Sequence, residues 1–178
     1  MHGVIFTSLR HYVEAAHGQA AADAVFAGEP AYLVDEIYPD ERLRRLLARV
    51  AEATGAAGDA TLHRFGAFTA EHTFARLYPA FFAIAPSARE LLLTVETRIH
   101  ELVRSTMPRA EPPRLHVEGD GPDAVRIEYR SARRLCVFLR GLVDGTAAHY
   151  GQQAQIEEPE CMLQGGEACV LRVRLSPS

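Results

Sequence analysis

The chain has 178 residues, of which 48% are hydrophobic and 24% charged, and its formal net charge is −4. This length is typical of one domain, so we expect residues 1–178 to form a single unit. A slightly acidic chain with scattered arginines lacks the basic surface that nucleic-acid binding requires. The N-terminus carries no secretory signal and no apolar run approaches the roughly 20 residues of a bilayer span, so we expect a cytoplasmic protein that binds no membrane.

The first hundred residues carry helical patterns interrupted by glycine and proline. Asp40, Asp59 and Ser87 are the expected N-caps of the three best-marked helices. Glu90 stands three residues after Ser87, as in a capping box. The predicted helices cover residues 10–17, 20–26, 32–37, 40–55, 59–78 and 87–107.

From residue 114 onward, alternation of polar and apolar residues replaces the helical pattern. Residues 114–118 and 125–129 alternate around a Gly-Asp-Gly-Pro-Asp turn, which predicts a β-hairpin. A helix over 134–150 follows, and two more alternating segments, 155–161 and 169–175, end the chain. This order predicts an α+β domain, with a helical N-terminal part followed by a C-terminal helix and a small antiparallel sheet.

Three hydrogen-bond donors alternate at the end of the second expected strand: Tyr129, Ser131 and Arg133. Because alternate residues of a strand point to one face, the three side chains would project together over about 13 Å. Arg133 adds a planar fork that suits a carboxylate. The row predicts a receptor for a dianionic ligand, and the alternative is that it decorates an exposed face.

His100 borders the apolar stripe of the sixth expected helix. A histidine in such a place is more often a hydrogen-bonded structural residue than a ligand. A neutral imidazole is nevertheless the usual axial ligand of haem iron. The residue alone leaves both interpretations open.

Taken together, these features resemble the haem–nitric oxide/oxygen binding (H-NOX) family, the bacterial relatives of the haem domain of soluble guanylate cyclase. The run from Tyr129 to Arg133 is similar to the family's propionate-binding Tyr-x-Ser-x-Arg signature. His100 stands twelve residues before a Pro-Pro-Arg-Leu segment, where the family has its ligand histidine. The resemblance extends over the whole chain and includes residues 1–5, 40–55 and 138–142.

The resemblance implies a haem b group buried between the helical N-terminal part and the C-terminal part. His100 would ligate the iron, while Tyr129, Ser131 and Arg133 would hold the propionates. A glycine on the proximal side, Gly66, would let a helix approach closely. The residues that would pack against the macrocycle or line the distal pocket are Ile5, Phe74, Pro113, Phe138 and Leu142, with Pro113 pressing on the porphyrin.

The resemblance also implies which gases bind. Oxygen-binding members carry a distal tyrosine at the position that Phe138 occupies here, and a phenyl ring offers no donor. We therefore expect ferrous haem to bind nitric oxide and carbon monoxide and to exclude oxygen. The stretch from Gly66 to Pro79 is one residue longer than the family pattern, so Thr69 or His72 could instead reach the pocket and supply a donor.

A sensor, rather than an enzyme, is the activity that the resemblance implies. Nitric oxide would break the bond between iron and His100 and shift the domain between two shapes. The signal would pass to a separate protein, which for stand-alone members is usually a histidine kinase or a cyclic-di-GMP enzyme. An enzyme such as a peroxidase needs a distal acid–base pair, and the expected distal residues are apolar.

The three cysteines, Cys136, Cys161 and Cys169, are an odd number and cannot all pair with one another. Three thiolates and one further ligand would satisfy tetrahedral zinc. Some members of the family hold zinc with three cysteines and a histidine, and Glu158 occupies the histidine's place here. Zinc, plain buried thiols and an oxidisable pair stay open, so the alternatives to a haem sensor are a zinc/thiol redox sensor and a haem-free ligand-binding module.

Overall fold

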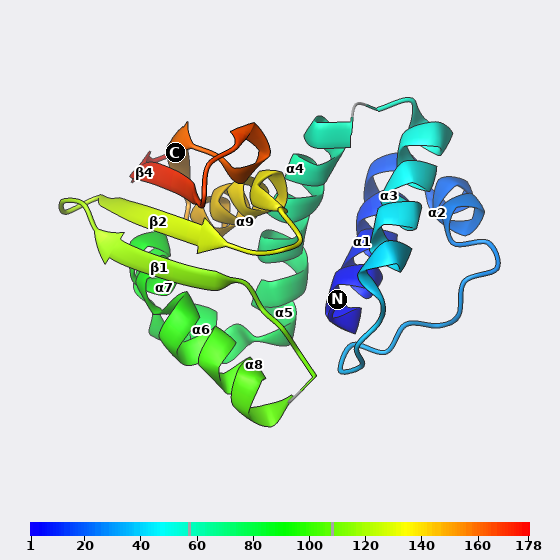
Figure 1. Ribbon diagram of the computed structural model, residues 1–178, viewed down its shortest axis with the longest axis horizontal. Helices are drawn as coiled ribbons and strands as arrows, with labels where there is room; N and C mark the ends of the chain where they lie inside the picture. Colours follow the sequence, from blue (N-terminus) through cyan, green and yellow to red (C-terminus); the bar gives the residue numbers. More distant parts are fainter. Residues whose placement is uncertain (57, 108) are drawn as a thin grey trace.

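A computed structural model describes residues 1–56, 58–107 and 109–178. Three N-terminal helices lie on one side, the sheet and the last long helix lie on the other, and α4 and α5 lie between them (Figure 1). The N-terminal helices are α1 (Gly3–His17), α2 (Gln19–Val25) and α3 (Asp40–Thr54). The central elements are α4 (Gly58–Phe68), the π-helix η1 (Thr69–Phe74), α5 (Ala75–Leu77), α6 (Pro79–Ile84), α7 (Ala88–Thr94), the π-helix η2 (Val95–His100) and α8 (Glu101–Thr106).

The C-terminal part contains a four-stranded antiparallel sheet in the order β1-β2-β4-β3. Ile127 at its centre pairs with Val117 on one side and Leu171 on the other. The remaining elements are β1 (Arg114–Gly119), β2 (Ala124–Arg130), α9 (Cys136–His149), β3 (Gln152–Glu160), the short 3-10 helix η3 (Met162–Gln164) and β4 (Cys169–Pro177). The predicted α+β architecture is confirmed. No helix among the described residues is long and apolar enough to cross a bilayer.

Two apolar cores meet on α9. The first gathers α1, α2, α3 and α4 around Phe6, Leu9 and Phe65, and it includes Phe138 of α9. The second lies between the sheet and α9, and includes Ile127 together with other residues of α9 such as Val143. Because one helix contributes to both cores, its two faces connect the N-terminal helices to the sheet.

The helix predicted over residues 32–37 is wrong, because this segment is extended and contains a turn. The Tyr32 ring stacks on Phe6 with centroids 4.4 Å apart, and Gly3 N–H donates to Glu36 O at 2.8 Å. Ile37 forms a β-bridge with His2. These contacts with α1 outweigh the weak intrinsic preference of a short helix.

The predicted caps have mixed outcomes. Ser87 caps α7 as expected, since its Oγ accepts from Glu90 N–H at 3.3 Å. Asp40 does not cap α3: Pro39 holds the cap position and the Asp40 side chain faces Arg133 instead. The side chain of proline has no hydrogen-bond acceptor, so α3 begins without a side-chain cap.

Glycine permits a close backbone contact where α4 crosses α9. A Cβ added to Gly66 would lie 2.3 Å from Phe138 O, and one added to Gly141 would lie 2.0 Å from His63 O. Real Cβ atoms cannot come so near to backbone atoms, so the two helices would have to separate. The close approach expected at Gly66 is therefore observed, and the approaching helix is α9.

We predict that Gly141→Ala lowers the free energy of unfolding by about 3 kcal/mol, because the new methyl group overlaps backbone that cannot rotate away. Urea denaturation followed by circular dichroism measures the change. Gly58→Ala is the control, since no atom lies within 4 Å of its added Cβ. Equal stability of the two variants would contradict the proposed backbone contact.

Candidate functional site

The two π-helical segments end at residues that the sequence singled out. Segment η1 ends at Phe74 and η2 ends at His100. A π-helix bonds residue i to i+5 instead of i+4, so each hydrogen bond closes over one more residue than in an α-helix, and such segments are frequent at functional sites.

His100 is a neutral imidazole held by one carboxylate. Its Nδ1 lies 2.9 Å from Glu96 Oε2, and its side chain is 15% exposed. Burial lowers the pKa of His100, although Glu96 opposes that shift. An ionised acceptor at Nδ1 fixes the proton on that nitrogen, which leaves the Nε2 lone pair available to a metal.

Glu96 binds three groups at once. Besides His100, it accepts a hydrogen bond from Arg104 and one from Leu115 N–H at 3.1 Å. Burial opposes ionisation of Glu96, but these hydrogen bonds lower its pKa overall. Sequence reasoning did not assign Glu96 to the site, because the contact with Leu115 joins segments 19 residues apart.

The donor row at the end of β2 differs from its prediction. Strand β2 ends at Arg130, so Tyr129 lies on the strand while Ser131 and Arg133 lie in the following turn. Leu135 N–H donates to the Tyr129 hydroxyl at 3.1 Å, and Arg133 N–H donates to Ser131 Oγ at 3.2 Å. A tight turn, and not strand alternation, therefore holds the three side chains together.

Tyr129 keeps its proton in this setting. Its side chain is buried, at 4% exposure, and burial raises the pKa of its hydroxyl. The phenol is therefore a hydrogen-bond donor at neutral pH, as a propionate-binding role requires.

Arg133 joins this turn to the N-terminal helices. Its Nε lies 2.8 Å from Asp40 Oδ2, and its Nη1 donates to Glu111 O at 2.5 Å. The Nε contact is an ion pair of poor angle, so this buried nitrogen has no well-formed hydrogen bond. Burial opposes ionisation of Asp40, but the Met1 amino group and Arg133 lower its pKa. Sequence reasoning missed this role of Asp40 because its position resembled a helix cap.

The expected distal residues belong to one apolar cluster. Ile5 and Phe138 are buried in the first core, and Phe74 and Leu142 pack against it. The Phe138 ring lies 4.9 Å from that of Phe65, measured between centroids. Pro113, the fifth expected contact, is half-buried directly before β1.

A chain of three buried hydroxyls joins α1 to η1. Thr69 Oγ1 donates to Phe65 O at 2.7 Å, so towards Ser8 Oγ, 2.9 Å away, it can only accept. Ser8 thereby uses its single hydrogen, and Thr73, 2.8 Å from Ser8, must donate to it. Each of the three hydroxyl hydrogens therefore has an acceptor: Thr73 donates to Ser8, Ser8 donates to Thr69, and Thr69 donates to Phe65 O. Thr69 thus has none left for a distal ligand, and the His72 side chain is 55% exposed.

The three cysteines and Glu158 form a second cluster. One ligand atom from each lies within 4.8 Å of the others. Cys161 Sγ is 3.6 Å from Cys136 Sγ and 3.8 Å from Cys169 Sγ, far longer than a disulfide bond. Sulfurs bound to tetrahedral zinc at about 2.3 Å would stand about 3.8 Å apart, so the spacing suits that metal.

The electrostatics of this cluster favour a cation. Burial and the neighbouring thiols raise the pKa of Cys136, and burial first of all raises that of Cys169. Glu158 is nearly buried, and its Oε1 has no hydrogen-bond partner, while its Oε2 pairs with Arg140 at 3.2 Å. A buried carboxylate oxygen without a donor is costly, and a metal ion at this point would compensate it.

Comparison with known proteins identifies the family. The profile of the family described as Haem-NO-binding (HNOB) matches residues 2–158. The chain belongs to this family. Its fold is accordingly that of the H-NOX domains, a family of haem-binding gas sensors.

Individual relatives are similar over nearly the whole chain. The crystal structure of an H-NOX protein from S. oneidensis in its Fe(II)NO state has a TM-score of 0.89 at 23% identity, covering 99% of each chain. Unliganded Fe(II) H-NOX from K. algicida has a TM-score of 0.80 at 25% identity, covering 100% of this chain and 98% of that one. Soluble guanylate cyclase 89Da from Drosophila melanogaster is 23% identical over 99% of this chain, which spans 28% of that relative's length.

The observed residues fit the haem that this family binds. A half-buried imidazole with a free Nε2 suits an axial ligand, and it lies on a helix joined to β1 by Glu96. A protonated phenol, a serine hydroxyl and a guanidinium suit two carboxylates. The apolar cluster of Ile5, Phe74, Phe138 and Leu142 suits the porphyrin face.

We predict that Ser8→Ala lowers the free energy of unfolding by about 2 kcal/mol, because it leaves the Thr73 hydrogen and the Thr69 oxygen unpaired. Thr73→Val removes one bond and leaves the other, so its cost should be about 1 kcal/mol. Urea denaturation compares them, with the exposed Ser105→Ala as control. A loss from Ser8→Ala no larger than that from Thr73→Val would contradict the two hydrogen bonds assigned to Ser8.

Proposed function

We propose that residues 1–178 form one sensor domain that binds nitric oxide at a ferrous haem b ligated by His100. The observation that carries the proposal is the half-buried pair of His100 and Glu96, in which Nδ1 faces the carboxylate and Nε2 is left free to bind a metal. Haem supplies an iron centre that binds diatomic gases on the side opposite the histidine. Tyr129, Ser131 and Arg133 hold the propionates in this proposal.

The surroundings of the gas support selection against oxygen. Bound oxygen is retained by distal hydrogen-bond donors, whereas nitric oxide and carbon monoxide do not depend on them. Phe138 offers none, and the hydroxyl hydrogens of Ser8, Thr69 and Thr73 are engaged with one another and with Phe65 O. We therefore propose that the domain binds nitric oxide and carbon monoxide and excludes oxygen.

The signal would begin with release of His100. That histidine shares Glu96 with Arg104 and with Leu115 N–H, so its movement alters contacts between η2, α8 and β1. We propose that the resulting change of shape is transmitted to a separate histidine kinase or cyclic-di-GMP enzyme, and that the domain itself catalyses no reaction. Membership of a sensor family supports this assignment.

The visible spectrum of the ferrous protein tests this proposal. After haem-replete expression we expect a Soret band that does not change in air and that nitric oxide shifts to the five-coordinate nitrosyl position. His100→Gly should lose the histidine-ligated spectrum and recover it with added imidazole. A stable oxy spectrum would refute oxygen exclusion alone, whereas the absence of any haem band would refute the sensor assignment.

We predict that Phe138→Tyr gives the ferrous protein a measurable affinity for oxygen, because the phenol adds the missing donor in a pocket that already fits a ring. Each good hydrogen bond in such a site contributes about 1 kcal/mol or more, or roughly a fivefold change in affinity. Spectra under graded oxygen pressure measure it. Phe81→Tyr, in α6, adds the same hydroxyl elsewhere and should behave as the wild type.

The cysteine cluster supports a second proposal, that Cys136, Cys161, Cys169 and Glu158 bind one zinc ion. The four ligand atoms lie within 4.8 Å of one another and the Glu158 Oε1 atom has no donor. Zinc would supply a structural cross-link between α9, β3 and β4. A thiol-only cluster is the competing assignment, and it would make these residues sensitive to oxidation.

We predict that the purified reduced protein contains one zinc ion per chain by elemental analysis. Glu158→Gln should weaken zinc binding about tenfold or more, because it removes a charged ligand. Glu157→Gln is the matched control, since this neighbouring carboxylate is exposed. Zinc content that is absent from the wild type, or unchanged in Cys136→Ser, would favour the thiol-only cluster.

A further inference from the structure

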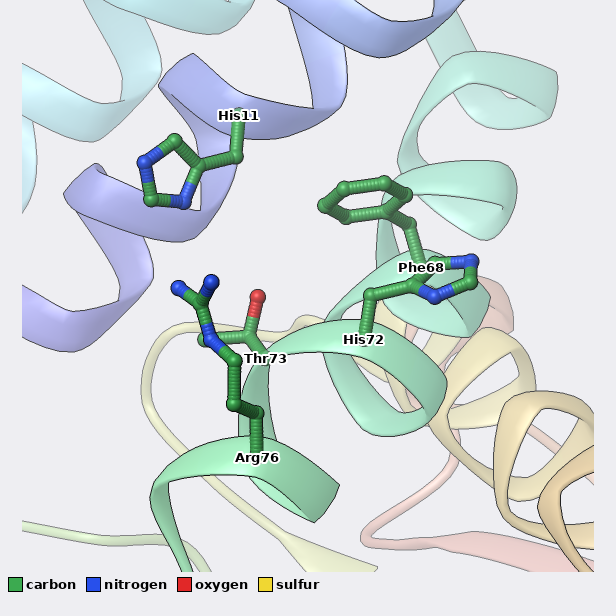
Figure 2. A pocket seen from close by; sticks show the side chains of 5 residues that line it. All are labelled: His11, Phe68, His72, Thr73 and Arg76. Carbon is green, nitrogen blue, oxygen red and sulfur yellow. The ribbon is translucent and has the colours of Figure 1, made fainter.

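A groove runs along the side of α1 between residues 26–34 and the helical turn formed by η1 and α5. Its volume is about 440 Å³, within the range typical of small-molecule sites. A smaller hollow of about 140 Å³ shares His11, Thr73 and Arg76 with it. Figure 2 shows these three side chains pointing toward one another, with His72 beside Phe68. We call the two together the α1 groove.

One part of the α1 groove is apolar. Phe6, Phe26 and Tyr32 line it, and the Tyr32 ring lies flat on Phe6. Val34 and Leu77 border the same groove and are 43% and 40% exposed. Large apolar side chains exposed around a concave surface are typical of a binding site.

The charged groups leave the other part positive. Glu29 is the acidic residue among those that line the groove, and it is only 7% exposed. It accepts from the Tyr32 hydroxyl at 2.6 Å and lies 3.6 Å from Arg45 and from Arg49. The hydrogen bond from Tyr32 lowers the pKa of Glu29 despite its burial, so this carboxylate is already compensated.

The basic side chains divide in the same way. Arg10 pairs with Asp23 at 2.7 Å. His11 and Arg76 have no ion-pair or hydrogen-bond partner in the part of the chain that the structure describes. They face one shared hollow from α1 and α5 (Figure 2). Two nitrogen-bearing side chains that converge without a carboxylate form a receptor for an anion.

The α1 groove is separate from the haem residues. None of the residues assigned to haem lines it. On α1, Thr7 of the groove follows Ile5 by about 200° at roughly 100° per residue, so the two side chains leave opposite faces of the helix. A ligand in the groove would not compete with haem.

We propose that the α1 groove binds a small amphipathic organic anion. The apolar body lies against Val34, Leu77 and the Tyr32 ring, and the carboxylate binds between His11 and Arg76. Such a ligand joins α1 to α5 next to the hydrogen bond between Ser8 and Thr73. It thereby stiffens the contact between the N-terminal helices and η1, which ends at Phe74. This proposal does not depend on whether the domain senses a gas.

Isothermal titration calorimetry of the full chain, as purified with its cofactor, tests the proposal with three probes. Decanoate carries both the charge and the apolar body, decanol lacks the charge, and acetate lacks the apolar body. We expect decanoate to bind one to one, and decanol and acetate to bind about tenfold or more weakly, because a charge-assisted hydrogen bond and apolar burial each contribute at least that factor. Equal affinity for decanoate and decanol would overturn the proposal.

Two matched variants locate the site. Arg76→Gln should weaken decanoate binding about tenfold, whereas Arg172→Gln, an exposed arginine on β4, should leave it unchanged. Circular dichroism and the haem spectrum verify that both variants fold. Undiminished binding by Arg76→Gln would overturn the assignment, as would binding to anionic lipid vesicles without binding to soluble decanoate, which would indicate a membrane surface. Absence of haem alone refutes the gas sensor and leaves this titration valid.

Discussion

The half-buried carboxylate of Glu96 is the constraint on which the candidate haem site depends. It holds the proton on His100 Nδ1, and it accepts from Arg104 and from Leu115 N–H at the start of β1. A histidine on a helix surface has many rotamers, and one ionised acceptor reduces them to a single orientation. The same hydrogen bonds keep Glu96 charged in spite of its burial. The same carboxylate therefore sets the orientation of the His100 ring and holds η2 against β1.

Two further polar contacts connect the N-terminal helices to the rest of the chain. Arg133 reaches Asp40 from the turn after β2, and Ser8 reaches Thr69 and Thr73 of η1. Both lie beside apolar residues, where an unpaired donor or acceptor is costly. They fix how α1 and α3 sit against the candidate haem residues. Apolar packing alone would specify that position less exactly, because hydrophobic contact has no direction.

Much of the fold was predictable from periodicity, but the details of the site were not. The strands, the Ser87 cap and the proximity of Cys161 and Cys169 follow from local patterns. Residues 32–37 were predicted wrongly as a helix, because the stacking of Tyr32 on Phe6 joins distant segments that no local window contains. The π-helical segments, the role of Asp40 and the turn that carries Ser131 and Arg133 likewise depend on tertiary contacts. The choice of candidate residues came from family resemblance, and their hydrogen-bond partners came only from the structure.

The contact between α4 and α9 has a mechanical consequence. These helices meet backbone to backbone at Gly66, Gly141 and Gly145, and theirs is the most extensive contact between helices of the described chain. Sliding of one helix along the other would bring these backbone atoms into collision, and the ring contact of Phe65 with Phe138 links the same two helices. We therefore expect α4 and α9 to behave as one rigid unit. Relative motion within the domain is then expected where α1, α2 and α3 pack against this pair of helices, beside Ile5 and Phe138.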